Sequence, residues 1–401
     1  MSIISSEEDT LFLSYLAIQT QNLSQAIMGK VSRSPSDITS EDILFLDSGT
    51  LITNPSPLSY KTIIYSEEHP QKRLIEEHSH IPLVMVSSSI IFTTGDVISI
   101  TEKGRVHRVF RAESKNNAFL VTEACNNLCL MCPQPPKPQP DNGYTGCISQ
   151  IDKTIELIDK QNIPDTLCLT GGEPTMLKGE LVNIIAKITD KMPHTLVHLL
   201  TNGRSFYYEE YAAEIARVAK GNMLAGIPLF AHVSDIHDYI VQSRGAFDQT
   251  MAGLLNCYKY GIAIELRVVL HKQTIPYLID LAKFIARNLF FVKHVALMGM
   301  ENMGFAKIHR EALHLDPDCY KHTLSEACRI LELYGIETRI FNLPLCVVNP
   351  EIHHLCAQSI SDFKNIFYTE CAECTKKEMC CGFFNSSTGK HQLTSQIKPF
   401  H

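Results

Sequence analysis

Short apolar runs alternate with longer amphipathic segments from about residue 116 onward. The runs have the length of strands, and the longer segments repeat apolar residues at helical spacing. Six strand–helix units follow one another, which indicates a parallel α/β sheet and favours an open, partial (β/α)6 version of the eight-unit barrel. Strands are predicted at 119–121, 166–170, 195–200, 224–231, 263–270 and 294–298, and helices at 149–161, 181–190, 207–220, 247–260, 278–288 and 319–334.

The sequence before this pattern has a different character. It opens with apolar residues at helical spacing over 11–18, and turn-rich sequence then separates short β-like runs at 43–46, 62–65, 83–86, 90–93 and 97–100. We therefore expect a small β-rich N-terminal domain over 1–114, the barrel over 115–335 and an irregular extension over 336–401. No motif identifies the role of the first part. It could bind a leader peptide at an exposed sheet edge, dock a partner or act as a structural cap.

Composition narrows the class of protein. The chain has 401 residues, 45% of them hydrophobic, and a net charge of −7, which disfavours a nucleic-acid-binding protein. No apolar run is long enough for a membrane span, and no secretory signal opens the sequence. We expect a cytoplasmic protein. In that reducing compartment, clustered cysteines are typical of metal or iron–sulfur ligands.

The first cysteine cluster follows the first predicted barrel strand. Cys125, Cys129 and Cys132 have C-x3-C-x2-C spacing. A loop at the carboxyl end of a strand is where barrels of this kind place their active sites. Three thiolates can hold three irons of a [4Fe–4S] cluster and leave the fourth iron open, whereas structural zinc normally takes four ligands.

This triplet, in this position, resembles the signature of the radical S-adenosylmethionine (SAM) enzymes. The resemblance implies a partial (β/α)6 barrel and a [4Fe–4S] cluster that binds SAM at its open iron. Cleavage of SAM then yields a 5′-deoxyadenosyl radical that abstracts a hydrogen atom. Family members often have an aromatic residue before the third cysteine, where this chain has Met131, which can still pack on the adenine.

Other segments at the predicted strand ends resemble the SAM contacts of the same family. Thr170 is followed by Gly-Gly-Glu-Pro, which matches the motif that binds the SAM amino group, and Thr201-Asn202-Gly203 ends the third strand. An inward Arg on the fifth strand is expected either to reach the SAM carboxylate or to close an ion pair. The implied SAM-binding residues are Met131, Gly171, Gly172, Glu173, Pro174, Thr201, Asn202, Ser234, Arg267 and Gly304.

A second cysteine set lies near the end of the chain. From the residues alone, four thiolates there could hold zinc or a second [4Fe–4S] cluster. The resemblance favours an auxiliary iron–sulfur cluster, because extensions of the SPASM or Twitch type occur at this end of peptide-modifying radical SAM enzymes. The expected ligands are Cys346, Cys371, Cys374 and Cys380, with Cys356 and Cys381 as alternatives.

The Pro-rich segment directly after Cys132 resembles one subgroup, the maturases of His-Xaa-Ser peptide-modification systems (HxsC type). Residues 237–242, 245–250, 359–365 and 382–384 contribute to the likeness. It implies a precursor peptide with His-Xaa-Ser repeats as substrate. The implied partners are a second radical SAM maturase, a small accessory protein and an external electron donor. The alternatives are radical SAM chemistry on a small molecule, and a non-catalytic iron–sulfur or zinc scaffold.

Overall fold

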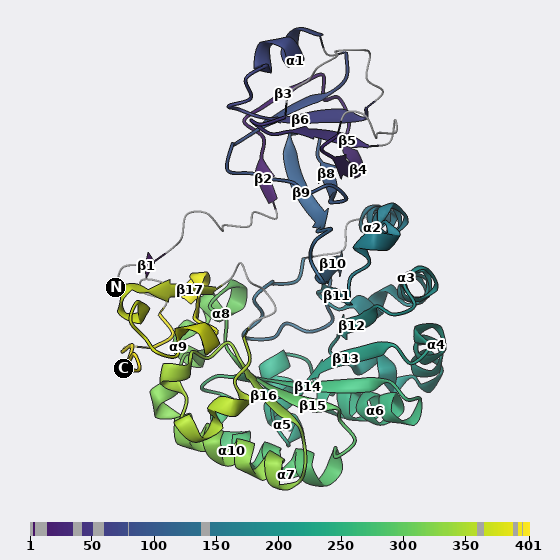
Figure 1. The fold of residues 1–401 in the computed structure, drawn as a ribbon. Coiled ribbons are helices and arrows are strands. Elements are labelled where there is room, and N and C mark those ends of the chain that lie inside the picture. Colours follow the sequence, from purple (N-terminus) through teal and green to yellow (C-terminus); the bar gives the residue numbers. More distant parts are fainter. Residues whose placement is uncertain are drawn as a thin grey trace. The chain divides into compact units, whose positions relative to one another are not determined.

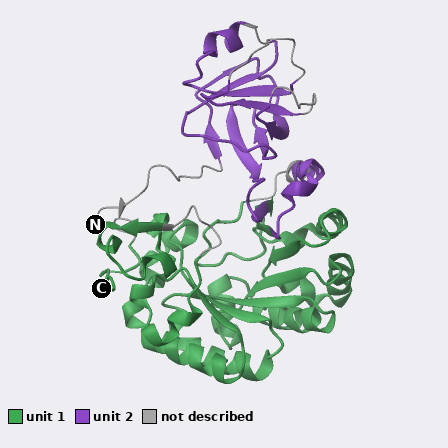
Figure 2. Ribbon diagram, viewed as in Figure 1, with its two compact units in different colours: residues 1–7, 120–145, 168–401 green, residues 8–119, 146–167 purple. Residues whose placement is uncertain are grey.

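The computed structural model describes residues 3–4, 14–34, 42–50, 60–78, 80–137, 145–358, 365–387, 392–394 and 396–401. The chain divides into two compact units (Figure 2). Residues 1–7, 120–145 and 168–401 form the first unit, and residues 8–119 and 146–167 form the second.

The first unit is built on a curled seven-stranded sheet whose strands lie in chain order (Figure 1). From the third to the seventh strand the neighbours pair in parallel, with helical crossovers between them. The strands are β10 (Asn116–Thr122), β11 (Thr166–Gly171), β12 (Leu196–Leu200), β13 (Met223–Pro228), β14 (Ala263–Leu270), β15 (His294–Gly299) and β16 (Thr338–Phe341).

All six predicted strand–helix units are present, and β16 adds a seventh strand that the sequence pattern did not predict. The crossover helices are α2 (Thr145–Leu157), α3 (Gly179–Lys191), α4 (Glu209–Ala219), α6 (Ala246–Lys259), α7 (Leu278–Asn288) and α10 (Lys321–Leu333). Each helix needs one apolar face; in α7, Leu278, Leu281, Ala282 and Ile285 recur at helical spacing and are buried. Short helices follow two strands: α5 (Ser234–Val241) after β13, and α8 (Gly304–Ile308) with α9 (Arg310–Leu313) after β15.

The second unit contains an eight-stranded sheet in the order β2-β9-β8-β4-β5-β6-β7-β3. Strand β5 is apolar at every position because Ile43 and Phe45 pack into one core and Leu44 and Leu46 into another. The strands are β2 (Ser14–Leu16), β3 (Gln19–Gln21), β4 (Ile27–Ser32), β5 (Ile43–Leu46), β6 (Thr62–Ser66), β7 (Leu83–Val86), β8 (Val97–Ile100) and β9 (Arg105–Phe110), with α1 (Lys72–His78) after β6.

The predicted helix over 11–18 is wrong over its described part, because this stretch closes the sheet of the second unit. Strands β2 and β3 lie at opposite ends of the sheet order but are separated in sequence only by Ala17 and Ile18. The N–H groups of these two residues donate to the carbonyl oxygens of Gly104 and Met85. The sheet therefore closes on itself.

The units differ from the predicted division in two places. The terminal strand β1 (Ile3–Ile4) joins β17 (Asn365–Tyr368) and β18 (Phe383–Phe384) in a three-stranded sheet of the first unit. Residues 146–167 group with the second unit, where Lys30 forms an ion pair of 3.0 Å with Asp159. The predicted strand at 90–93 is a loop.

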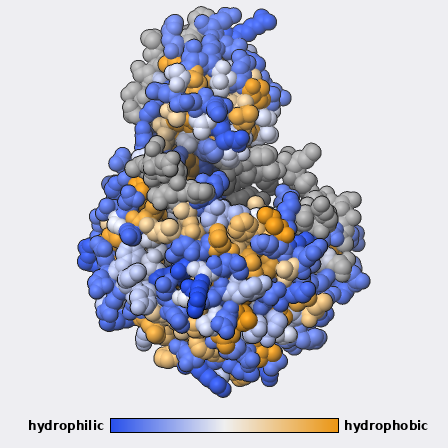
Figure 3. Space-filling view, turned by 180° about the vertical axis from the view of Figure 1, so that it is seen from behind, coloured by the Kyte–Doolittle hydropathy of each residue, from blue (hydrophilic) through white to orange (hydrophobic). Residues whose placement is uncertain are grey.

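Hydrophobic and hydrophilic groups are interspersed over the face drawn in Figure 3. No helix among the described residues is both long enough and apolar enough to cross a membrane.

We predict that Gly253→Ala destabilises the first unit. An added Cβ would lie 2.2 Å from the carbonyl oxygen of Gly203, so backbone must move, at a cost of about 2 kcal/mol that exceeds the helix-propensity gain. Gly179→Ala is the matched control, because a Cβ there meets nothing within 4 Å. Urea unfolding should separate the two variants; equal midpoints would contradict the prediction.

Candidate active site

The loop that carries the first three cysteines follows β10. The N–H of Leu128 donates to the carbonyl oxygen of Val241 at the end of α5, at 3.0 Å. On the other side, the N–H of Phe305 in α8 donates to the carbonyl oxygen of Cys132 at 2.8 Å. The loop is therefore held from both sides by segments that follow later strands of the same sheet.

Cys125, Cys129 and Cys132 line one cavity of about 340 Å³. Its walls are the carboxyl ends of β11 to β15 and the turns that follow them, the part of a parallel sheet where ligands bind. The other lining residues are Asn127, Met131, Pro133, Pro136, Thr170, Gly171, Gly172, Leu200, Thr201, Asn202, Gly226, Pro228, Phe230, Arg267, Val269, Met298, Gly299, Met300, Glu301 and Asn342.

The three thiols suit a polynuclear metal group. Burial raises the pKa of Cys125 to about 11 and of Cys129 to about 12, and the charges of neighbouring thiols add to both shifts. Burial also raises the pKa of Cys132. Three thiolates here need a compensating cation. Three thiols that line one cavity are a donor set that fits a cluster in which each thiolate binds its own iron.

Two glycines allow the next turn to lie directly on the cysteine loop. A Cβ on Gly172 would be 2.1 Å from the carbonyl oxygen of Ala124, and one on Gly171 would be 2.2 Å from that of Thr122. The N–H groups of Gly172 and Glu173 donate to these same two carbonyl oxygens. Only residues without a side chain permit this approach at Gly171 and Gly172.

Glu173 is fully buried and does not line the cavity. Its carboxylate accepts hydrogen bonds from the N–H and hydroxyl of Thr175, from the Thr201 hydroxyl at 2.6 Å and from the N–H of Asn202 at 2.6 Å. The structure therefore places Gly171, Gly172, Thr201 and Asn202 at the cavity, whereas Glu173 joins the turns that carry them.

Arg267 lies on the cavity wall and also belongs to an ion pair. Its guanidinium is 3.3 Å from Glu265, and His294 is 2.9 Å from the other oxygen of this carboxylate. Burial alone would raise the pKa of Glu265, but hydrogen bonds with His198 and His294 and the charge of Arg267 outweigh it and hold that pKa below its usual range. The position of Arg267 is thus compatible with both expected roles, contact with the SAM carboxylate and closure of an ion pair.

Of the remaining predicted SAM-binding residues, some line the cavity and others do not. Met131 lines the cavity and is buried. Gly304 lies behind the cysteine loop, where a Cβ would be 2.6 Å from the carbonyl oxygen of Cys132. Ser234 is exposed at the first turn of α5, and neither it nor Pro174 lines the cavity.

Sequence reasoning missed several residues of the site. Phe230 and Asn342 line the cavity, although Asn342 follows the unpredicted strand β16. Arg204 contacts the cysteine loop directly, with its Nη1 2.8 Å from the carbonyl oxygen of Asn126. Its position directly after Thr201-Asn202-Gly203 was the available signal.

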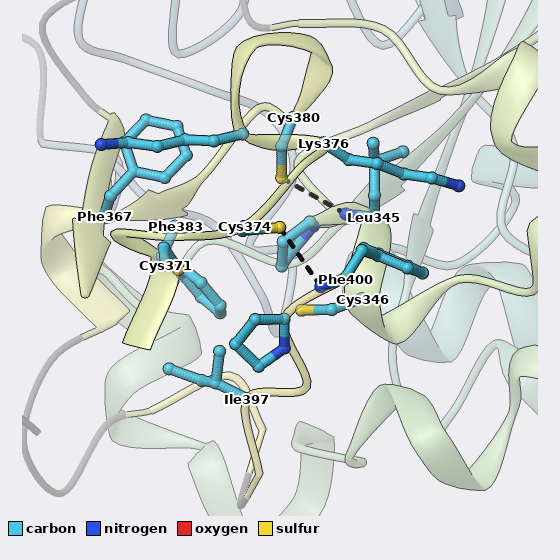
Figure 4. Close-up of a pocket in the computed structure, with 13 residues that line it drawn as sticks. Leu345, Cys346, Phe367, Cys371, Cys374, Lys376, Cys380, Phe383, Ile397 and Phe400 are labelled. Carbon is cyan, nitrogen blue, oxygen red and sulfur yellow. Dashed lines mark hydrogen bonds between the residues drawn. The ribbon is translucent and has the colours of Figure 1, made fainter. Parts of the chain in front are cut away.

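A second cavity, of about 20 Å³, contains four thiols (Figure 4). They belong to Cys346, Cys371, Cys374 and Cys380, and the lining is otherwise mostly apolar. Cys356 and Cys381 do not line it. The structure thus brings Cys346 together with the three expected ligands of the stretch 371–380.

Backbone N–H groups point at two of these sulfur atoms, as Figure 4 shows. Leu345 donates to Cys380 Sγ and Phe400 to Cys374 Sγ, each at 3.4 Å. The neighbouring Cys381 side chain and hydrogen bonds from the backbone N–H groups of Gly382 and Leu345 hold the pKa of Cys380 below its usual range. Such donors stabilise thiolate and are typical of both zinc and iron–sulfur sites.

Residues 119–285 match the model of the radical SAM superfamily. The matched segment covers less than half of the chain, and it carries all three thiols and most of the other residues that line the three-thiol cavity.

Two curated proteins are similar in sequence to part of this chain. An Fe-coproporphyrin III synthase from Methanosarcina barkeri is 29% identical over 165 residues, which cover 40% of this chain and 39% of that protein. An AdoMet-dependent heme synthase from Nitratidesulfovibrio vulgaris is 26% identical over 185 residues, 45% of this chain and 47% of that protein. The matched region spans less than half the length of either relative.

Two solved structures are similar to part of this chain at low identity. The anSMEcpe enzyme with bound AdoMet and Cp18Cys peptide is 17% identical, with a TM-score of 0.43 over 55% of this chain and 63% of that one. Coproporphyrinogen III oxidase from Escherichia coli is 14% identical, with a TM-score of 0.44 over 56% and 54%. These likenesses say nothing about the substrate of this chain.

His237 makes the stability of the site dependent on pH. It is buried in α5 beside Phe230, and burial lowers its pKa from 6.5 to about 4. The unfolded chain therefore binds more protons between these values, and stability is lost as the pH falls through this window. From about pH 7.5 to 5.5 the apoprotein should lose about 1 kcal/mol more than His237→Gln in urea unfolding. The exposed His194→Gln should retain the wild-type slope, and equal slopes for all three proteins would contradict the prediction.

Proposed function

We propose that the protein is a radical SAM enzyme. The observation that carries this proposal is the set of three thiols on one loop, lining a 340 Å³ cavity at the carboxyl ends of parallel strands. The cavity has room for an exchangeable molecule beside the three thiols. A purely structural metal site would instead be closed by a fourth protein ligand.

When bound, a [4Fe–4S] cluster with an open iron supplies the electron that cleaves SAM to methionine and a 5′-deoxyadenosyl radical. The protein residues position and enclose the reactants. Cys125, Cys129 and Cys132 hold the cluster, and the backbone of Gly171 and Gly172 forms the adjoining wall. The remaining wall includes Met131, Thr201, Asn202 and Arg267, which present a thioether, polar groups and a positive charge.

We propose that Cys346, Cys371, Cys374 and Cys380 hold a second, auxiliary [4Fe–4S] cluster. The four thiols surround one cavity, as a metal group held by four thiolates requires. The choice of iron–sulfur over zinc rests on the resemblance to peptide-modifying radical SAM enzymes. Ile397, Pro399 and Phe400 also line the cavity, so it is largely screened from solvent. Four protein ligands leave no iron open, which suits electron transfer or structural support.

For the substrate we propose a ribosomally made precursor peptide with His-Xaa-Ser repeats. The proposal is supported by the resemblance of the segment after Cys132 and by the second cysteine set, which is typical of peptide-modifying members. It implies a second maturase, a small accessory protein and an external electron donor as partners. Of the other segments with this resemblance, residues 359–364 lie outside the described part of the chain.

A small-molecule substrate is the second candidate. It is favoured by the two curated relatives, whose names specify heme and Fe-coproporphyrin synthesis. A tetrapyrrole would have to enter a cavity whose described lining offers one cation, Arg267, to substrate carboxylates. The third alternative, a scaffold without catalysis, requires that SAM is not cleaved.

The cysteine sets predict iron contents. Anaerobically reconstituted wild-type protein should hold about eight irons per chain. Cys129→Ala should lose about half of these irons and all 5′-deoxyadenosine formation. Cys374→Ala should lose the other half of the irons and keep the EPR signal that changes when SAM is added. Cys356→Ala is the matched control, because this thiol does not line the cavity. A content of four irons and one zinc per chain would show that zinc occupies the second site instead of a cluster. SAM cleavage by Cys129→Ala would refute the radical SAM assignment.

The two substrate classes predict different products. Reduced enzyme with SAM and a His-Xaa-Ser precursor should give 5′-deoxyadenosine and a mass change of the peptide. The same assay with Fe-coproporphyrin III in place of peptide should give only background cleavage. A porphyrin product without peptide modification would support the small-molecule candidate. The absence of 5′-deoxyadenosine in the wild-type protein would favour the scaffold.

A further inference from the structure

Arg204 connects three loops around the cysteine triplet. It begins the short helix η3 (Arg204–Tyr207), directly after the turn at the end of β12. Its Nη1 lies 2.8 Å from the carbonyl oxygen of Asn126 and 2.6 Å from Asn127 Oδ1, on the cysteine loop. The same guanidinium donates to Ser243 Oγ at 2.9 Å and to Gln249 Oε1 at 2.7 Å, in the α5–α6 region.

The contact with Asn127 leads directly to a cysteine sulfur. The backbone N–H of Asn127 donates to Cys125 Sγ at 3.4 Å. Because Arg204 fixes both the preceding carbonyl and the side chain of Asn127, it sets the direction of this N–H. Hydrogen bonds to ligand sulfur atoms are one of the means by which proteins adjust the reduction potential of a cluster.

The hydrogen bonds of Arg204 go to uncharged groups. Its four acceptors among the described residues are all uncharged oxygen atoms. A cation beside a cluster stabilises its reduced, more negative form.

We propose that Arg204 is a positioning residue of the first cluster. It orients the Asn127 N–H toward Cys125, fixes the spacing between Cys125 and Cys129, and raises the reduction potential of the cluster through its charge. This role rests on the proposed function, since it requires a cluster at the triplet. Arg204 and the residues that it contacts are not cysteine ligands, so the effect of Arg204 on the cluster can be separated from the loss of a ligand.

The test compares Arg204→Gln and Arg204→Lys with the wild-type full-length chain, all reconstituted anaerobically. The control is Arg217→Gln, which removes the same charge from an exposed position of α4. Potentiometric titration followed by EPR gives the potential of the cluster whose signal changes on addition of SAM. A chelator challenge gives its rate of loss, and thermal unfolding reports overall stability.

Arg204→Gln should shift the potential to more negative values and speed loss of this cluster to the chelator about tenfold, since a charge-assisted anchor is removed. Arg204→Lys should keep a near wild-type potential but still lose the cluster faster, because lysine supplies the charge without the planar fork. Arg217→Gln should match the wild type in both measurements. Ser243→Ala and Gln249→Leu, which each remove one anchor, should show intermediate rates with an unchanged melting temperature.

Wild-type potential and chelation rate in Arg204→Gln would overturn the role of Arg204, with the radical SAM assignment intact. Equal faster loss in Arg217→Gln would overturn it as well, because the effect would then be one of net charge. A wild-type chain without a SAM-responsive cluster signal would overturn both this role and the proposed function.

Discussion

The arrangement of the candidate active site depends on one fully buried carboxylate. Glu173 is enclosed between the turns that follow β11 and β12, and a charge in that position is costly unless its oxygens are fully hydrogen-bonded. Thr175, Thr201 and Asn202 supply those bonds. Each donor is thereby fixed relative to the other turn. The contribution of Glu173 is therefore to make two strand ends a single rigid wall.

The cysteine loop is fastened to this wall by the next residues along the same turn. Asn202, held by Glu173 through its backbone, donates through its side chain to Asn126 Oδ1 at 2.6 Å. Arg204 adds contacts to Asn126 and Asn127. A continuous series of hydrogen bonds therefore runs from the buried carboxylate to the segment between Cys125 and Cys129. A cluster that must be held at a fixed distance from a second ligand requires such preorganisation.

Sequence periodicity predicted the parts of this architecture that depend on local pattern. The six strand–helix units and the cysteine loop follow from alternation of apolar runs and from spacing, and the structure contains them. Strand β16 was missed because its residues, Thr-Arg-Ile-Phe, do not form a continuous apolar run, although Asn342 beyond it lines the cavity. Residues 14–16 lie within the predicted helix over 11–18 but form strand β2, because closing the N-terminal sheet outweighs local propensity. The role of Arg204 depends on contacts with residues 39 to 78 positions away, which no local pattern reveals.

The two cysteine-lined cavities differ in the property that separates an exchangeable site from a closed one. The first has three thiols beside about 340 Å³ of space, with backbone groups, a thioether and a cation on its wall. The second has four thiols around about 20 Å³, and Phe400 from the C-terminal residues both lines it and donates its N–H to a sulfur. A metal group in the first can bind a further ligand, because one coordination position has no protein donor. A metal group held by the four thiols of the second would have a protein donor at every position. Exchange of small molecules would then occur at the first cavity, and the second would act on it by passing electrons or by supporting the fold.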